Sequence, residues 1–407
     1  MKFNWKFCGV LVFICLLIVG CGKDKNKETN TVNLYYNSST VKSINYVVEL
    51  IKKYEEKEGK KINLVPVNSE EEIEKKIGDE KEAALVLLDG YSFIDFNNKN
   101  YLRDITYLFK EKETREKFAN INNLYGIYEG KYYGLGITPF TLELVYNEEL
   151  LKSKGIKFED NNYIEALKKL NEKKIKIPTY VKSEYTKEIL FSALVANDTI
   201  AYDLHKVDDV NSVEDKIKHI KNGQKIFDTL HELYTKNIIK EDMFQDEGES
   251  AIKNFNEGKI PVLLTTTLTS EKITDKRGIG TINKMPINNK SVNSTVGMDC
   301  IICSSSGKTK IDDLDNFFRY IINSDVFEEL TKKNCITGNR KADSNLKGVQ
   351  IKMVNSIVSA DDINMFYFNI ISNENIRKID KECKNVLSGK YDGKEWSRII
   401  GKWDIKK

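Results

Sequence analysis

Cys300 and Cys303 are the closest pair of cysteines in the chain, within the segment TVGMDCIICSSS. Two intervening residues are the spacing of redox-active dithiols, and thiolates can also bind a metal. A reactive pair needs a helix N-terminus after its first cysteine to stabilise the thiolate, whereas this segment has the pattern of a strand. In a strand the two side chains point to opposite faces. We therefore expect both cysteines to be buried core residues.

Other catalytic and metal-binding patterns are missing from the sequence. The only histidines are His205, His219 and His231, and none is close in sequence to the cysteines, so a zinc site is poorly supplied. The chain contains no GxSxG, P-loop or HExxH motif, and GIGTIN at Gly278 lacks the last glycine of the dinucleotide fingerprint. We expect no enzymatic activity, no metal and no cofactor.

The charge of the chain is nearly balanced, with 64 Lys and Arg against 61 Asp and Glu. A basic footprint for nucleic acid is therefore absent, and we expect no nucleic-acid partner. Charge runs such as SEEEIEKKIGDEKEA alternate in sign, which is typical of a solvated helix face.

The N-terminal segment has the pattern of a signal peptide. Lys2 and Lys6 precede an unbroken apolar run from Phe7 to Gly20. A helix that spans a bilayer needs about twenty residues, so this run suits a signal h-region better. A short membrane-anchor helix is the alternative. We predict a signal peptide over residues 1–20.

The residues around Cys21 resemble the lipobox of bacterial lipoproteins, as LIVGC. The resemblance implies that the Cys21 thiol takes a diacylglyceryl group, that cleavage follows Gly20, and that the new amino terminus is acylated. Several acyl chains make a stable anchor. The polar stretch up to residue 30 predicts a flexible tether, so we expect a lipid-anchored protein on the outer face of the cell membrane.

The segment after the tether alternates between strand and helix patterns. Strand patterns cover residues 31–37, 61–67 and 83–90, and the apolar run of the third is continuous, which indicates burial on both faces of a sheet covered by helices. This alternation predicts a doubly wound α/β lobe, whose ligands lie at the carboxyl ends of its strands. Here those ends are residues 37–40 and 89–91.

The rest of the chain is helical in its first part and mixed afterwards. Residues 143–251 are mostly helical in pattern, strand patterns return at 260–268, 278–289 and 294–306, and helices follow to the C-terminus. Removal of residues 1–20 leaves 387 of the 407 residues, which is too long for one ordinary core and suits two domains.

Several motifs resemble those of the extracellular solute-binding proteins of the large sugar-type family, the lipoprotein receptors of ABC importers. The best match is IYEGKYYGLGITPFTLELVYNEELLKSKGI, and AIKNFNEGKIPVLL and FFRYIINSDVFEELTKKNCITGNRKA follow in the family's order. The resemblance implies a monomeric, two-lobed α/β protein that binds a small solute between its lobes and delivers it to a membrane permease.

The resemblance also implies where the chain crosses between the lobes. Residues 133–146 would leave the first lobe as an extended segment, and Pro139 is tolerated because no ladder N–H is needed there. Two later crossings would lie near 296–303 and 336–340. The predicted lobes are residues 31–140 with 297–337, and 141–296 with 338–407.

Candidate ligand-binding residues lie at the predicted strand ends and crossings: Tyr36, Asp89, Tyr91, Thr138, Thr141, Asp299 and Arg340. A carbohydrate would stack on aromatic rings, but the mature chain has only Trp396 and Trp403, which we predict to pack on one face of a terminal helix. A cationic solute such as a polyamine is the alternative ligand, because Asp89, Glu143 and Asp299 all lie near crossings. A non-transporting lipoprotein on the same scaffold, a sensor partner or an adhesin, is the second alternative.

Overall fold

The structure is a computed structural model, and it describes residues 31–79, 82–205, 217, 220–274, 278–286, 294–323 and 325–401. The predicted signal peptide, Cys21, the tether, His219 and Trp403 lie outside the described residues. Among the helices that it does describe, none is long and apolar enough to cross a membrane.

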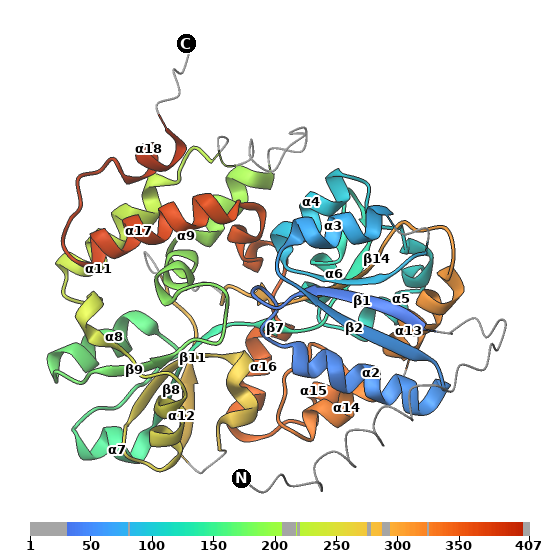
Figure 1. The fold of residues 1–407 in the computed structure, drawn as a ribbon. Helices are drawn as coiled ribbons and strands as arrows, with labels where there is room; N and C mark the ends of the chain where they lie inside the picture. The colour runs from blue at the N-terminus through green and yellow to red at the C-terminus, as the bar shows by residue number, and fades with distance from the viewer. Residues whose placement is uncertain are drawn as a thin grey trace, which may run out of the picture. The chain divides into compact units, whose positions relative to one another are not determined.

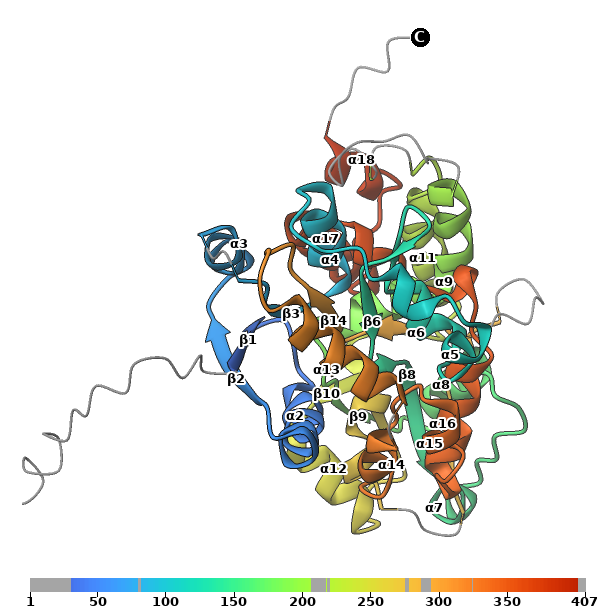
Figure 2. The same cartoon turned by 90° about the vertical axis from the view of Figure 1, so that its right-hand side faces the viewer.

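The first sheet of the described chain has five strands in the order β2-β1-β3-β14-β6. Its strands are β1 (Thr31–Asn37), β2 (Lys61–Val67), β3 (Leu85–Leu88), β6 (Gly134–Gly136) and β14 (Ile301–Ser304). β1 and β3 are parallel, with Leu34 opposite Leu85, whereas β14 is antiparallel to both of its neighbours. Figure 2 shows β3, β14 and β6 side by side. The predicted strands are confirmed, in a mixed rather than purely parallel sheet.

Helices cover both faces of this sheet. They are α2 (Ile44–Glu58), α3 (Glu70–Asp79), α4 (Gly90–Asn98), α5 (Lys112–Glu116), α6 (Asn120–Leu124), α13 (Ile311–Asn323) and α14 (Val326–Thr331). Leu85 and Leu87 of β3 share a core with α2, α13 and α14, while Val86 and Leu88 share another with α3 and α4. The apolar pattern of β3 therefore reflects burial on both faces, as expected.

Helix α2 illustrates how the sequence specifies these elements. Its buried residues recur at helical spacing and include Val47, Leu50, Ile51 and Tyr54. Gly59 follows the helix with a φ of 67°, a left-handed conformation that glycine adopts without steric cost. The helix therefore ends where the sequence provides a glycine.

The second sheet of the described chain also has five strands, in the order β10-β9-β11-β8-β12. They are β8 (Leu142–Asn147), β9 (Ile177–Tyr180), β10 (Phe244–Asp246), β11 (Val262–Thr266) and β12 (Ile279–Ile282). β9 is parallel to β10 and β11, and β8 is antiparallel to β11 and β12. β9 and β10 lie in a region whose pattern predicted mostly helix, so this part of the prediction was incomplete.

Helices account for most of the remaining residues around the second sheet: α7 (Glu148–Ser153), α8 (Tyr163–Glu172), α9 (Lys187–His205), α11 (Gln224–Thr235), α12 (Glu249–Asn256), α17 (Asn373–Leu387) and α18 (Glu395–Ile400). Figure 1 shows α9, α11 and α17 packed together. Trp396 of α18 is buried, and its indole N–H donates to the Ile220 carbonyl at 3.2 Å. Trp396 therefore belongs to the core, and the predicted packing of Trp396 and Trp403 on one helix face stays a prediction.

The stretch from β6 to β8 crosses from the first sheet to the second, which confirms the first predicted crossing. Between them, β7 (Pro139–Phe140) pairs antiparallel with β13 (Gly297–Met298), so the outgoing segment and the segment that returns to β14 lie side by side (Figure 1). Pro139 lies in this two-stranded ribbon, outside both five-stranded sheets, where a proline costs no sheet hydrogen bond.

The third predicted crossing leads into two helices, α15 (Arg340–Asp343) and α16 (Gly348–Val358). Asn339 bridges to Phe118, and α16 contacts both α6 and β12. Helix α16 therefore touches an element beside each sheet. The lobe boundaries given above stay a prediction.

The two neighbouring cysteines lie on opposite faces of the first sheet, as expected for a strand. Cys300 packs in the core with α2, and Cys303 in the core with α3 and α4. Both are fully buried and form no disulfide. Burial raises the pKa of the Cys300 thiol to about 12, which disfavours the reactive thiolate. Among the described residues, no group of three or more His, Cys, Asp or Glu could hold a metal ion.

Replacing both Cys300 and Cys303 with alanine is expected to lower the free energy of unfolding by about 1–3 kcal/mol, because two small buried side chains are lost. Urea denaturation measures this loss. We expect solute binding and the metal content of the purified protein to match those of the wild type. A bound metal that disappears in the variant would contradict the structural role.

Candidate ligand site between the two sheets

The carboxyl ends of parallel strands from both sheets are followed by segments that contact each other. β1 and β3 precede the segments with Tyr46 and Asp89, while β9 and β11 precede those with Lys182 and Leu268. The Tyr46 hydroxyl donates to the Leu268 carbonyl at 3.5 Å, and the Lys182 ammonium lies 5.8 Å from the centre of the Tyr46 ring. Because ligands of α/β proteins bind at such strand ends, this region is the candidate site.

Asp89 lies directly after β3 and caps helix α4, accepting a hydrogen bond from the Ser92 N–H at 2.7 Å. Only 2% of the residue is exposed. The pKa of its carboxyl is raised to about 6, chiefly by burial and also by the nearby Glu70 and Asp299 carboxylates, against the opposing effect of the Ser92 hydrogen bonds. The surroundings of Asp89 therefore disfavour the ionised form of its carboxyl group.

Asp299 lies between β13 and β14 and holds the start of α2. It accepts hydrogen bonds from the N–H groups of Lys42 at 3.0 Å and Ser43 at 2.7 Å, and from the Ser43 hydroxyl. Burial raises the pKa of Asp299, while these hydrogen bonds lower it. The Ser43 hydroxyl also lies 2.9 Å from the Thr138 hydroxyl, so two predicted site residues, Thr138 and Asp299, share one network.

Glu184, in the segment after β9, brings a carboxylate from the second sheet to the same region. Burial raises its pKa well above the usual value, and the charge of Asp89 is the next cause, with smaller effects of Asp299 and Glu70. The neighbouring Tyr185 is buried and packs edge-on against Phe366, with ring centres 4.7 Å apart. Sequence reasoning missed Glu184 because it missed the strand that precedes it.

We call Glu70, Asp89, Glu184 and Asp299 the acidic site. Glu70 lies in the first turn of α3 and accepts a hydrogen bond from the Asn37 amide at 2.8 Å. Among the described residues, Lys182 is the cation whose charge lowers the pKa of Asp299, and it also lies 3.9 Å from Glu271. The electrostatic effects described here thus involve four carboxyl groups and the Lys182 ammonium group.

Thr141 takes part in a different buried network. Its hydroxyl donates to Glu143 of β8, which also accepts hydrogen bonds from the Thr281 hydroxyl and, at 2.9 Å, from the Asn283 amide. The Thr141 N–H donates to the Thr267 hydroxyl at 3.1 Å. Burial raises the pKa of Glu143 to about 7, against the effect of its three donors. Thr141 and Glu143 thus connect the outgoing crossing to β12 and the segment after it.

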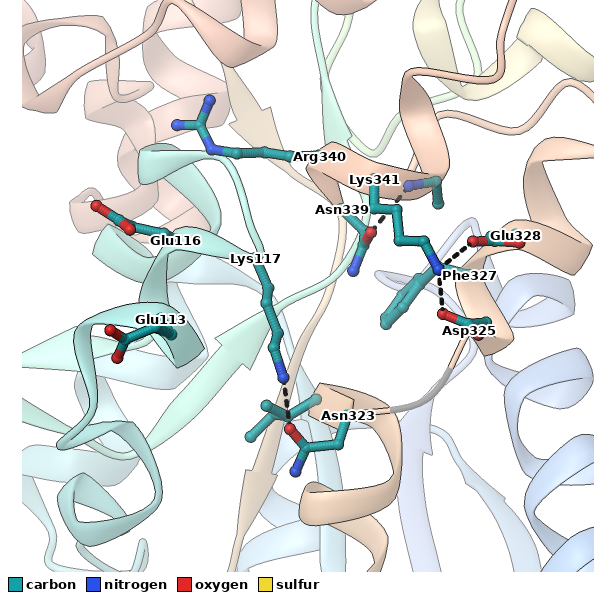
Figure 3. A pocket seen from close by; sticks show the side chains of 12 residues that line it. Glu113, Glu116, Lys117, Asn323, Asp325, Phe327, Glu328, Asn339, Arg340 and Lys341 are labelled. Atoms are coloured by element: carbon teal, nitrogen blue, oxygen red, sulfur yellow. Dashed lines mark hydrogen bonds and ion pairs between the residues drawn. The ribbon is translucent and has the colours of Figure 1, made fainter.

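Arg340 lies at a pocket of about 340 Å³ beside α5, α13, α14 and α15 (Figure 3). Its guanidinium Nε donates to the Phe118 carbonyl at 2.9 Å. In the same pocket the Lys341 ammonium lies 2.7 Å from Asp325 and 2.8 Å from Glu328. The described contacts of Arg340 include no residue of the acidic site, and its role in ligand binding stays a prediction.

The two predicted tyrosines are half-buried. Tyr36 lies in β1 and packs against the core shared with α2, and Tyr91 lies in the first turn of α4, two residues after Asp89. Of the predicted residues, the structure thus joins Asp89, Asp299 and Thr138 most directly. It adds Glu184 and Glu70, and it places Thr141 and Arg340 in other networks.

Residues 49–346 match the family described as bacterial extracellular solute-binding protein. This is more than half of the chain, so the protein belongs to that family of extracellular solute-binding proteins. A chain solved in a study of xylan utilization by the thermophilic bacterium Caldanaerobius polysaccharolyticus is similar in structure, with a TM-score of 0.61. The two share 14% identity, and the match covers 91% of this chain and 98% of the other. No curated protein sequence matches the chain.

Proposed function

We propose that this protein captures a small solute at the acidic site and delivers it to the permease of an ABC importer. The observation that carries the proposal is the meeting of strand ends from both sheets around buried polar side chains. A solute that contacts both sheets binds the closed arrangement more tightly than an open one, and so shifts the equilibrium toward closure. The permease then has a distinct, loaded form to recognise.

A carbohydrate is the first candidate ligand. The similar structure from the study of xylan utilization supports this class by analogy. Tyr36 and Tyr91 supply aromatic faces near the strand ends, and the carboxyl groups of the acidic site can hydrogen-bond to sugar hydroxyls. The proposed sugar is small, because the mature chain has only two tryptophans to stack on a ring and one of them, Trp396, is buried in the core.

A cationic solute such as a polyamine is the second candidate, and the charges of the acidic site favour it. Burial raises the pKa of both Asp89 and Glu184, and the charges of other carboxylates add to this effect: Glu70 and Asp299 at Asp89, and Asp89 itself at Glu184. Buried carboxylates need a cationic partner or proton. A ligand ammonium group would supply that partner.

A thermal-shift screen of the purified protein against mono- and disaccharides and against polyamines tests solute capture. We expect one class to raise the melting temperature with saturation, because a ligand that binds only the folded state stabilises it. If neither class changes the melting temperature, the result favours the non-transporting alternative, a sensor partner or adhesin.

We also propose that the protein is a monomer and that Cys21 carries the lipid anchor that holds it at the outer face of the membrane. Cys21→Ala is expected to move the protein from the membrane fraction to the soluble or uncleaved pool, because the acylated thiol is lost. Cys15→Ala, which changes a thiol within the predicted signal peptide, is the matched control and should fractionate like the wild type. Wild-type fractionation and mobility of Cys21→Ala would contradict the anchor.

A further inference from the structure

A second cavity, of about 440 Å³, lies beside β12 and is lined by no residue of the acidic site. We call it the lysine pocket, and its lining residues are Asn161, Thr281, Lys284, Lys352, Asn355, Ser356 and Ser359. These described residues offer two ammonium groups, two amides and three hydroxyls, and none of them is a carboxylate. The lining therefore carries a net positive charge, although the Thr281 hydroxyl already donates to Glu143 and the Asn161 amide to Asn283.

Helix α16 and its C-cap residue, Ser359, together provide more than half of this lining. The spacing of these residues places them on one side of the helix, because they are three, one and three positions apart: Lys352, Asn355, Ser356 and Ser359. The other side of α16 is buried in the core through Val349, Met353 and Ile357. On this face Lys352, Asn355 and Ser359 are exposed, whereas Ser356 is only 5% exposed.

Neither lysine of the pocket has a carboxylate partner among the described residues. The Lys352 ammonium donates to the Ile279 carbonyl at 3.2 Å, which leaves its charge uncompensated. Lysines elsewhere in the chain are often paired, as Lys341 is with Asp325 and Glu328. Two unpaired ammonium groups that face one cavity favour an anion there, because an anion would reduce their mutual repulsion.

The pocket is also held in place before any ligand binds. The Asn161 side-chain oxygen accepts hydrogen bonds from the N–H groups of Asn283 at 2.8 Å and Lys284 at 3.1 Å, which fixes the backbone beside β12. The Ser356 hydroxyl makes no hydrogen bond with the part of the chain that the structure describes, although it lines the cavity. A bound anion could accept a hydrogen bond from it without reorganisation.

We propose that the lysine pocket binds a small oxyanion, either free phosphate or sulfate or the phosphate group of a phosphomonoester. Lys284 and Lys352 would supply charge-assisted hydrogen bonds to its oxygens, which are stronger than neutral ones. Ser356 and Asn355 would donate to the remaining oxygens. Because α16 contacts β12 of the second sheet and α6, which lies beside the first sheet, the anion would bind to a helix that contacts elements of both regions.

Isothermal titration calorimetry of the full chain with inorganic phosphate, at constant ionic strength maintained with chloride, tests this site. We expect saturable binding with one phosphate per chain, and at least about a tenfold weaker affinity after K284Q/K352Q, because two charged donors are lost. K61Q/K110Q, which changes two exposed lysines elsewhere, is the matched control and should bind like the wild type.

A second titration with glycerol 3-phosphate distinguishes the source of the anion. Tighter binding of this phosphomonoester than of phosphate would assign the pocket to a phosphate group on a larger molecule, and equal binding would assign it to the free ion. Non-saturable heats with both compounds, or equal affinities in wild type and K284Q/K352Q, would overturn the proposal. Solute capture at the acidic site should be unchanged in K284Q/K352Q, so the two proposals fail independently.

Discussion

The unfolding free energy of the Glu143→Gln variant is expected to fall less than that of the wild type when the pH rises from 5 to 8. The difference between the two drops should be about 3 kcal/mol. Burial raises the pKa of Glu143 from 4.5 to about 7, so between these values the folded state binds a proton that the unfolded state has released. The contribution of the Glu143 carboxyl to the unfolding free energy therefore falls as the pH rises from 4.5 to about 7. Glutamine keeps an acceptor for the Thr141 and Asn283 donors but does not ionise.

Urea denaturation of both proteins at several pH values between 5 and 8 measures this difference. Glu149→Gln is the control, because Glu149 is exposed at the start of α7, a few residues after Glu143 in the same segment. It should leave the pH dependence as in the wild type. Parallel curves for wild type and Glu143→Gln would contradict the account of Glu143 as a carboxyl that is buried and deprotonates only near neutral pH.

Asp89→Asn is expected to weaken binding of a cationic solute by at least about 100-fold, because removing one partner of a buried charge pair leaves the other charge uncompensated. For a carbohydrate we expect a loss of about tenfold, the typical effect of a hydrogen bond to a charged group. Affinity for a cation should also fall steeply with salt, whereas affinity for a sugar should hardly change.

Asp343→Asn is the matched control for Asp89→Asn. Asp343 is also buried, has its pKa raised to about 6 by burial, and accepts hydrogen bonds from backbone N–H groups, at Thr337 and Gly338. It is no member of the acidic site, so its replacement reports the general cost of changing a buried aspartate. Equal losses of affinity in both variants would argue against a direct contact of Asp89 with the solute.

Local signals predicted the first sheet and its helices well. Helix α2 shows apolar residues at helical spacing and a glycine at its end, and β3 shows an apolar run, so each pattern has one simple structural solution. The crossing from β6 to β8 followed from its resemblance to a family motif. Strand β9 was missed because it is four residues long and contains Pro178, and its strand conformation depends on pairing with β10 and β11, which are distant in sequence.

The candidate site could be predicted only where its residues lie next to strands that the sequence pattern reveals. Asp89 and Asp299 follow or join recognisable strands, so their position at strand ends could be read from the sequence. Glu184 follows β9 and could not be placed without it. Arg340 follows a predicted crossing, but the pairing of Asn339 with Phe118 places it beside α5 and α14. Such tertiary pairing has no local signal in the sequence.

Isothermal titration calorimetry with the solute class identified by the thermal screen tests the central claim most directly. If the acidic site captures the solute, the wild type binds one molecule per chain, Asp89→Asn binds it at least about tenfold more weakly, and Asp343→Asn binds it like the wild type. Absence of binding by the folded wild type to every saccharide and polyamine, or undiminished binding by Asp89→Asn, would contradict capture of these solutes at this site.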